Sequence, residues 1–285
     1  MLLLNASGCL DALAAPDVAN ALDRFVTKTI TPLPRDGNAP VRIAETDVGM
    51  LNAIGLANPG RQRFLTETLP RLHELLSVPI WVSVGGFSAA DYADTCLALG
   101  GSEAAAIELN LSCPNVDEAP ESAAEIVAAC GAATASPLYA KLSAAVPDIA
   151  AVARAVEAAG ADGLSLVNTL RGLKLDERTL RPVLDRAVGG LSGPALKPIA
   201  LAAVYTCRRA TALPIVGMGG VASGRDALEL VAAGATHVAL GTVLFSDPDA
   251  PRRVREELVQ ECAKVFVASP DDVFAAAHDG TRVPA

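Results

Sequence analysis

The sequence predicts an α/β fold, a single (β/α)8 TIM barrel with long loops at the C-terminal face. Short β-branched or aliphatic runs alternate with longer Ala-, Glu- and Arg-rich stretches of helical period, the pattern of a parallel sheet covered by helices. Eight such strand–helix units fit into 285 residues, a usual length for this barrel. The first strand is followed by Asn5-Ala-Ser-Gly8 rather than GxGxxG, which argues against a doubly wound sheet.

Each predicted strand is a short apolar run bounded by turn residues. Helices end at a Gly before the next strand in residues 159–163 and 233–237, because Gly adopts the left-handed cap conformation readily. The predicted strands are residues 2–6, 24–29, 80–84, 106–111, 138–142, 163–167, 214–217 and 237–240. The clearest predicted helices are residues 88–99, 123–133, 149–159 and 224–233.

Two stretches, residues 31–60 and 171–198, fit no simple βα unit and are rich in Gly and Pro. Loops of this length inside a compact domain are usually lids or binding loops. No linker or shift in composition divides the chain. We therefore expect residues 1–285 to form one domain.

Composition excludes several classes of protein. A formal net charge of -9 argues against nucleic-acid binding, which needs a basic face. No apolar run approaches the roughly 18 residues that span a membrane, and the first residues lack a signal-peptide pattern. The 6 cysteines show neither CxxC pairs nor metal-ligand spacing. Free thiols in a reducing, cytoplasmic setting, with no metal site, are the simplest interpretation.

Glycines follow the last two predicted strands, where barrels commonly bind phosphate with backbone N–H groups. Gly219 and Gly220 follow the seventh strand, and Gly241 and Thr242 follow the eighth. These glycines could instead serve only as tight turns. Their position at the C-terminal face favours a phosphate site.

Two lysines, Lys28 and Lys141, lie within predicted strands. A lone buried ammonium group is costly unless it is paired. Two inward lysines beside a phosphate site suggest an anionic, electron-rich cofactor. Flavin mononucleotide (FMN) fits, because one lysine would stabilise negative charge on the reduced ring.

Asn52, Asn110, Asn115 and Asn168 lie at the predicted barrel mouth. A single Asn in a loop is more often a turn residue, but four converging amides suit a flat ring with alternating N–H and C=O edges. Cys113 lies in a Cys-Pro turn between two of them, where a thiolate would accept a proton. We interpret the other five cysteines as inert thiols.

Together these motifs resemble the class 1 dihydroorotate dehydrogenases over most of the chain. The resemblance implies an FMN-bearing barrel that oxidises (S)-dihydroorotate to orotate in pyrimidine synthesis. It also implies that Cys113 takes the C5 proton while hydride passes from C6 to the flavin. The matching segments are Asn5-Ala-Ser-Gly8, Thr27-Lys-Thr29, Gly49-Met-Leu-Asn-Ala-Ile-Gly-Leu56, Asn110-Leu-Ser-Cys-Pro-Asn115, Asn168-Thr169 and residues 217–220.

The resemblance further implies two overlapping sets of binding residues. The substrate would be held by Lys28, Asn52, Ile54, Gly55, Leu56, Asn110, Asn115, Asn168 and Thr169. FMN would be held by Ala6, Ser7, Lys28, Thr29, Asn110, Lys141, Val167, Gly193, Gly219, Gly220, Gly241 and Thr242.

Residues 167–170 and 189–199 resemble the NAD-linked (1B) subgroup, whose catalytic subunit works with a partner carrying FAD and a [2Fe–2S] cluster. This chain has neither a second dinucleotide motif nor clustered cysteines, so the partner would supply both. A homodimeric core is expected, with no nucleic-acid or membrane partner. The membrane-associated class 2 enzymes carry an N-terminal helical extension; because the first strand is predicted at Leu2, we expect this chain to resemble class 1 instead. The final acceptor, NAD through the partner or fumarate, stays open.

One departure and three alternatives accompany this interpretation. Residues 116–122 are acidic and lack glycine, whereas the family usually has a longer Gly-rich loop there. Another FMN barrel acting on a reduced uracil-like ring is the main alternative, because dihydropyrimidine dehydrogenases share Asn-Leu-Ser-Cys-Pro. Dihydrouridine synthesis in tRNA conflicts with the negative charge. A non-catalytic barrel conflicts with the intact set of Lys28, Cys113 and Lys141.

Overall fold

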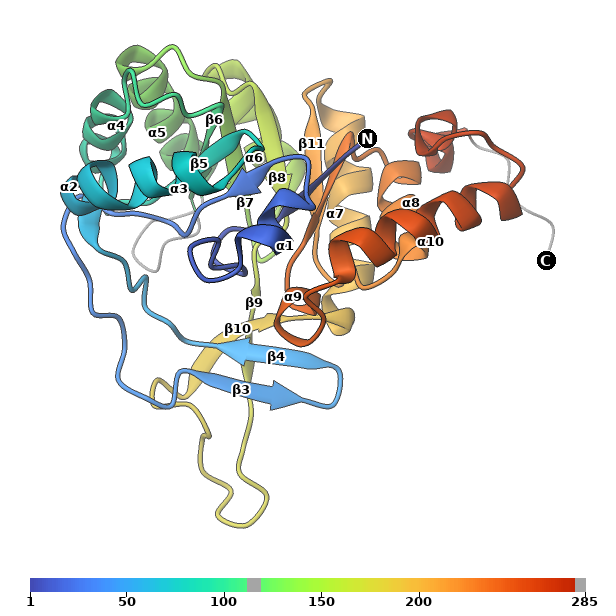
Figure 1. Cartoon of the computed structure of the whole chain (residues 1–285), viewed down its shortest axis with the longest axis horizontal. Helices are drawn as coiled ribbons and strands as arrows, with labels where there is room; N and C mark the ends of the chain where they lie inside the picture. The colour runs from blue at the N-terminus through green and yellow to red at the C-terminus, as the bar shows by residue number, and fades with distance from the viewer. Residues whose placement is uncertain (112–118, 280–285) are drawn as a thin grey trace.

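Eight parallel strands form a nearly closed barrel, as predicted (Figure 1). The computed structural model describes residues 1–111 and 119–279. The strand order is β1-β12-β11-β8-β7-β6-β5-β2, and a parallel bridge between Leu4 and Arg24 joins its two ends. The barrel strands are β1 (Leu2–Asn5), β2 (Phe25–Val26), β5 (Ile80–Val84), β6 (Ala106–Asn110), β7 (Leu138–Leu142), β8 (Gly163–Leu166), β11 (Ile215–Met218) and β12 (His237–Leu240).

Strand β2 is much shorter than the predicted residues 24–29. The cause is a side chain, because the Thr27 hydroxyl accepts the backbone N–H of Ser83 at 3.1 Å. A side-chain acceptor there takes the place of a backbone carbonyl. The regular pairing is consequently interrupted at Lys28 and Thr29, and it resumes at Ile30, which bridges Val84 of β5.

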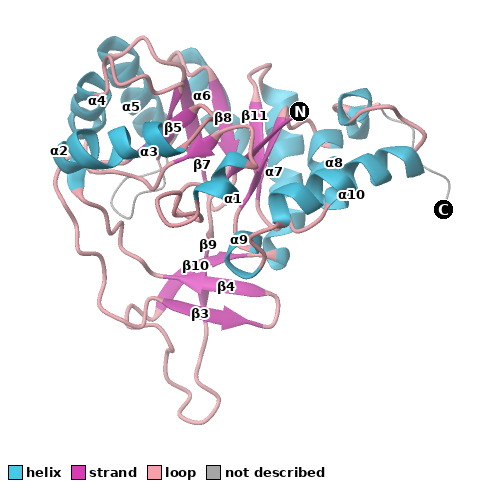
Figure 2. Cartoon of the chain, in the orientation of Figure 1, coloured by secondary structure: helices cyan, strands magenta, loops and turns pink. Residues whose placement is uncertain are grey.

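Helices cover the outside of the barrel (Figure 2). The predicted helices are present, and three begin at a residue whose side chain accepts a backbone N–H: Ser88, Asp148 and Ser223. None of the described helices is long and apolar enough to cross a membrane. The longer helices are α4 (Ala89–Ala98), α5 (Pro120–Ala133), α6 (Ile149–Ala158), α7 (Lys197–Ala210), α8 (Gly224–Ala232) and α10 (Ala250–Lys264).

Short helical segments complete the described chain. The α-helical ones are α1 (Pro16–Asn20), α2 (Gly60–Arg63), α3 (Leu69–Leu75) and α9 (Val243–Ser246), and a π-helical turn, Phe64–Thr68, links α2 to α3. The 3₁₀ turns are Pro194–Leu196, Pro270–Val273 and Ala276–His278.

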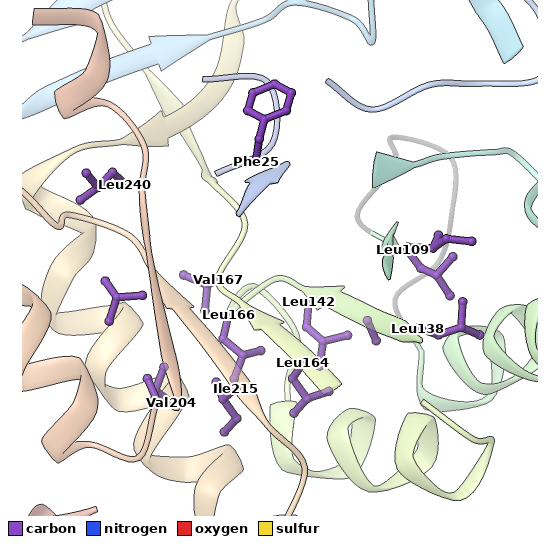
Figure 3. Close-up of a cluster of buried hydrophobic side chains, with 14 of the residues drawn as sticks. Phe25, Leu109, Leu138, Leu142, Leu164, Leu166, Val167, Val204, Ile215 and Leu240 are labelled. Carbon is purple, nitrogen blue, oxygen red and sulfur yellow. The ribbon is translucent and has the colours of Figure 1, made fainter. Parts of the chain in front are cut away.

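The core has an outer and an inner part. Outside the strands, side chains such as Leu164, Ile215 and Val204 pack between the sheet and the helices (Figure 3). Inside the barrel lies a separate apolar cluster of Leu4, Val26, Trp81, Ala106, Tyr139, Val216, Met218 and Ala239. Because side chains alternate along a strand, the next inward positions on three strands belong to Ser83, Glu108 and Lys141, all buried. The interior therefore becomes polar toward the carboxyl ends of the strands.

The two long segments form a second sheet, which the sequence analysis did not predict. Its antiparallel order is β3-β4-β10-β9, and it lies beside the barrel (Figure 1). One face packs Ala44, Leu51 and Leu184 into a small core. The strands are β3 (Ile43–Thr46), β4 (Gly49–Asn52), β9 (Leu170–Leu173) and β10 (Val188–Ser192).

Candidate active site

A cavity of about 1170 Å³ is lined by residues from the carboxyl ends of the barrel strands and from the second sheet. Every candidate site residue within the described chain lines it. Cys113 and Asn115 lie outside the described residues. The candidates that the fold brings together are Ala6, Ser7, Lys28, Thr29, Asn52, Ile54, Gly55, Leu56, Asn110, Lys141, Val167, Asn168, Thr169, Gly193, Gly219, Gly220, Gly241 and Thr242.

Glycines allow the backbone itself to form one wall of this cavity. Gly219 and Gly220 have φ angles of 118° and 76°, in the region that side chains disfavour. A Cβ atom on Gly220 would lie 2.8 Å from the backbone nitrogen of Lys197. A Cβ atom on Gly193 would lie 2.6 Å from the Cα of Gly49. These close approaches exclude side chains and leave a backbone surface of the kind that binds phosphate.

The carboxylate of Asp226 holds this wall together. Its Oδ2 accepts the backbone N–H of Ala222 at 2.9 Å and the hydroxyl of Ser223 at 2.8 Å. Its Oδ1 lies 2.5 Å from Nζ of Lys197, which begins α7. Burial alone would raise the pKa of Asp226, but the hydrogen bonds from Lys197, Ala222 and Ser223 hold that pKa below its usual value. One carboxylate thus joins the loop that contains Gly219 and Gly220 to the helix behind it.

Lys141 is a paired cation inside the barrel. Its Nζ donates to the hydroxyl of Ser7 at 2.8 Å and lies 3.4 Å from Oε1 of Glu108. Glu108 is only 1% exposed and also accepts the hydroxyl of Ser83 at 3.2 Å. Glu108 is not among the site residues predicted from the sequence. The available signal was a lone carboxylate in an otherwise apolar strand, two residues before Asn110.

Hydrogen bonds orient the asparagine side chains of the cavity: Asn110 and Asn168 bond to each other, and Asn52 bonds to the backbone of the second sheet. The Asn168 amide donates to Oδ1 of Asn110 at 3.1 Å, and the Asn110 amide donates to the Thr29 hydroxyl at 3.3 Å. Asn52 of β4 donates to the carbonyl of Gly190 at 3.2 Å. Tyr92 donates to the backbone carbonyl of Asn110 at 2.6 Å. The amides are therefore oriented before any ligand binds.

Every charged side chain in the described cavity lining is positive, and no aspartate or glutamate lines it there. The surrounding chain has a formal net charge of -9. A cleft lined by one sign of charge attracts ions of the opposite sign. The lining cations are Lys28, Arg35, Lys141, Arg171 and Arg186.

None of the three arginines is among the site residues predicted from the sequence. Both Arg171 and Arg186 lie in the segment predicted to be a long loop; Arg171 is brought to the cavity by the pairing of β9 with β10, and Arg186 lies just before β10. Arg35 donates to the carbonyl of Gly55 at 3.3 Å and lies 4.9 Å from the ring centre of Phe87.

The cysteines within the described chain divide into two groups. Cys9, which we interpreted as an inert thiol, is half-buried and lines the cavity, and burial raises its pKa. Cys96, Cys130, Cys207 and Cys262 are buried. The described residues contain no group of three or more His, Cys, Asp or Glu side chains that would hold a metal ion.

Comparison with known proteins gives one consistent result. The family model described as "Dihydroorotate dehydrogenase" matches residues 2–262. Three relatives share the name "Dihydroorotate dehydrogenase B (NAD(+)), catalytic subunit". The relative from Latilactobacillus sakei is 48% identical over 254 residues, covering 86% of this chain and 83% of its own. Those from Listeria monocytogenes and Geobacillus kaustophilus are 43% and 45% identical, covering 89% and 80% of this chain and 86% and 75% of their own.

Proposed function

The chain belongs to the dihydroorotate dehydrogenase family, and from this we propose that it is an FMN-dependent catalytic subunit that oxidises (S)-dihydroorotate to orotate in pyrimidine biosynthesis. The observation that carries the proposal is the cavity. It combines a wall built from glycine backbone, a set of oriented amides and, among the described lining residues, charged side chains that are all positive. Those features suit a phosphate, a flat polar ring and a carboxylate.

The residues present fit FMN. The close-packed backbone at Gly193, Gly219 and Gly220 provides a phosphate cradle that any Cβ atom would obstruct. Lys141 supplies a positive charge that is anchored on Glu108 and reaches the cavity wall. The volume of about 1170 Å³ exceeds that of a usual small-molecule pocket and leaves room for a second ligand. Once bound, FMN would supply the two-electron acceptor for the oxidation.

The substrate would lie against the amides. Asn52, Asn110 and Asn168 present donors and acceptors that match the ring edges of dihydroorotate. Lys28 would offset the charge of its carboxylate. By motif, Cys113 would take the C5 proton as its thiolate, the form of cysteine that acts as a base.

A partner subunit follows from the relatives. Their shared name refers to NAD and to a catalytic subunit, so we propose that electrons leave this chain through a second subunit that carries FAD and a [2Fe–2S] cluster. Such a partner would supply the dinucleotide-binding site, for which this chain has no sequence motif. A homodimeric core stays a prediction.

The alternative, oxidation or reduction of an uncharged pyrimidine ring, needs no carboxylate site. The cationic lining therefore favours dihydroorotate over that alternative.

The test is direct. The purified protein should be yellow with one FMN per chain, and dihydroorotate should bleach the flavin without oxygen. Dihydrouracil, which has the same ring without the carboxylate, is the matched control and should bleach it far more slowly. A colourless protein that fails to take up FMN, or equal bleaching by both compounds, would contradict the proposal.

A further inference from the structure

A single row of residues crosses the second sheet on the side that faces the cavity. Ile43 pairs with Asn52, Asn52 pairs with Gly190, and Gly190 pairs with Arg171. Residues directly opposite one another in an antiparallel sheet project to the same face. All of these residues line the cavity. Arg171 is therefore on the same face as Asn52, an amide of the proposed substrate site.

Gly190 has no side chain between Arg171 and Asn52, and Thr169 occupies the space that a side chain would fill. A Cβ atom there would lie 2.2 Å from the Thr169 hydroxyl and 3.4 Å from the Asn52 amide nitrogen. The polar groups of Asn52 and Thr169 thus gather over Gly190. Neighbouring strands lie about 5 Å apart, so the backbone of Arg171 lies about one strand spacing from Gly190. The long side chain of Arg171 lines the same cavity as Asn52 and Thr169.

The charge of Arg171 is uncompensated within the described chain, where it forms no ion pair within 4.0 Å. Arg186 and Arg35, the other exposed arginines of the lining, form none there either, although Arg35 donates to the carbonyl of Gly55. In contrast, Lys141 is paired with Glu108, and Lys197 is paired with Asp226 and Glu229. The paired cations have structural partners, whereas Arg171 and Arg186 at the cavity rim form no ion pair with any residue of the described chain.

We propose that Arg171, assisted by Arg186, captures anionic substrate at the cavity rim and favours carboxylate-bearing rings over neutral ones. This inference rests on the proposed function. A cation about 10 Å or less from an incoming anion acts within the Debye length at moderate salt. Its main effect is on the rate of encounter, and it diminishes as salt increases. Arg171 would thus govern capture without taking part in the chemical step.

The experiment changes charge in steps at one position. Arg171→Gln lowers the charge by one unit, and Arg171→Glu lowers it by two units. Arg178→Gln and Arg178→Glu make the same changes in charge outside the cavity lining. Arg178 is an exposed residue between β9 and β10, so it controls for net charge. The readouts are the second-order rate of anaerobic flavin bleaching by dihydroorotate, its limit at saturating substrate, and orotate affinity by calorimetry.

At about 20 mM salt, each unit of charge removed from Arg171 should slow the second-order rate and weaken orotate binding roughly two- to fivefold. The saturating rate should not change, and the differences should nearly vanish at about 0.5 M salt. Arg178 variants should behave as wild type.

Two results would overturn the inference: Arg171 variants that match their Arg178 counterparts, or a loss that persists at high salt together with a lower saturating rate. If dihydroorotate failed to reduce the wild type, the proposed function would fall. Orotate calorimetry would still decide whether Arg171 attracts the anion.

Discussion

Lys141 and Glu108 form an ion pair inside the barrel, with 3.4 Å between Nζ and Oε1 and side chains only 6% and 1% exposed. The lysine also donates to Ser7 at the cavity wall. The glutamate lies one layer deeper and accepts from Ser83. The pair therefore fixes a positive charge at the base of the candidate FMN site.

Breaking this pair should cost stability. Lys141→Met or Glu108→Gln alone leaves one buried charge without its partner, and each should lower the free energy of unfolding by about 3–5 kcal/mol. The double variant removes both charges and should lose much less than the sum. Denaturant titration of the flavin-free proteins measures this, and strict additivity would show that the two residues act independently.

Removing the cation should also affect the flavin. Lys141→Ala should weaken FMN retention or slow flavin reduction, because a cation near the ring favours the negative charge that arrives during reduction. FMN titration and stopped-flow bleaching by dihydroorotate are the measurements. A variant equal to wild type in both would remove this role from Lys141.

Asp226 should matter for the phosphate end of FMN. Asp226→Asn weakens the link between the backbone of Ala222 and Lys197, and FMN affinity should fall roughly tenfold because hydrogen bonds to charged groups are worth about 1.5–3 kcal/mol. Riboflavin lacks the phosphate, so its binding should barely change. Glu229→Gln is the matched control, since Glu229 contacts Lys197 without holding Ala222. Equal losses for both flavins would contradict a phosphate-specific effect.

The same carboxylate should give a pH signature. Because the folded pKa of Asp226 lies below its ordinary value of 3.8, its stabilisation is complete above that value and is lost as the pH falls through the folded pKa. The difference in unfolding free energy between wild type and Asp226→Asn should therefore be constant near neutrality and shrink below about pH 4. A difference that grows in acid would contradict this assignment.

Cys113 lies outside the described residues, and its role is predicted from its motif. An ordinary thiol has a pKa of about 8.5, so flavin reduction should rise with pH until the thiol has titrated. Cys113→Ser should bind orotate yet reduce its flavin roughly 10²–10⁴-fold more slowly, because serine is a far weaker base. Serine at Cys96, Cys130, Cys207 or Cys262 is the control. Wild-type rates in Cys113→Ser across the pH range would identify another base.

The acceptor can be tested with the isolated chain. Because FAD and the cluster are proposed to lie on a partner, the chain alone should not reduce NAD at a useful rate. It should still reduce an artificial dye with dihydroorotate as donor. Rapid NAD reduction by the pure single chain would show that no partner is needed.

Local sequence was enough to predict the barrel. The runs at Ile80–Val84, Leu138–Leu142 and His237–Leu240 are strands with the predicted ends, because alternation and burial act between near neighbours in the chain. The position of candidate residues at strand ends followed from the same pattern, since parallel strands in a barrel bring their carboxyl ends together. The described members of that set all line one cavity.

The partners of those residues depended on contacts between distant segments. The second sheet joins β4 to β10, where Asn52 donates to Gly190 at a separation of 138 positions in the chain. No periodicity of the local sequence indicates such long-range pairing. Glu108 meets Lys141 only because β6 and β7 are neighbours in register. Arg171 reaches the cavity only through its pairing with β10. Sequence alone determined which chemical groups the protein carries to one end of its barrel, whereas tertiary structure decided which charges are paired and which line the cavity unpaired, because pairing depends on distance in space.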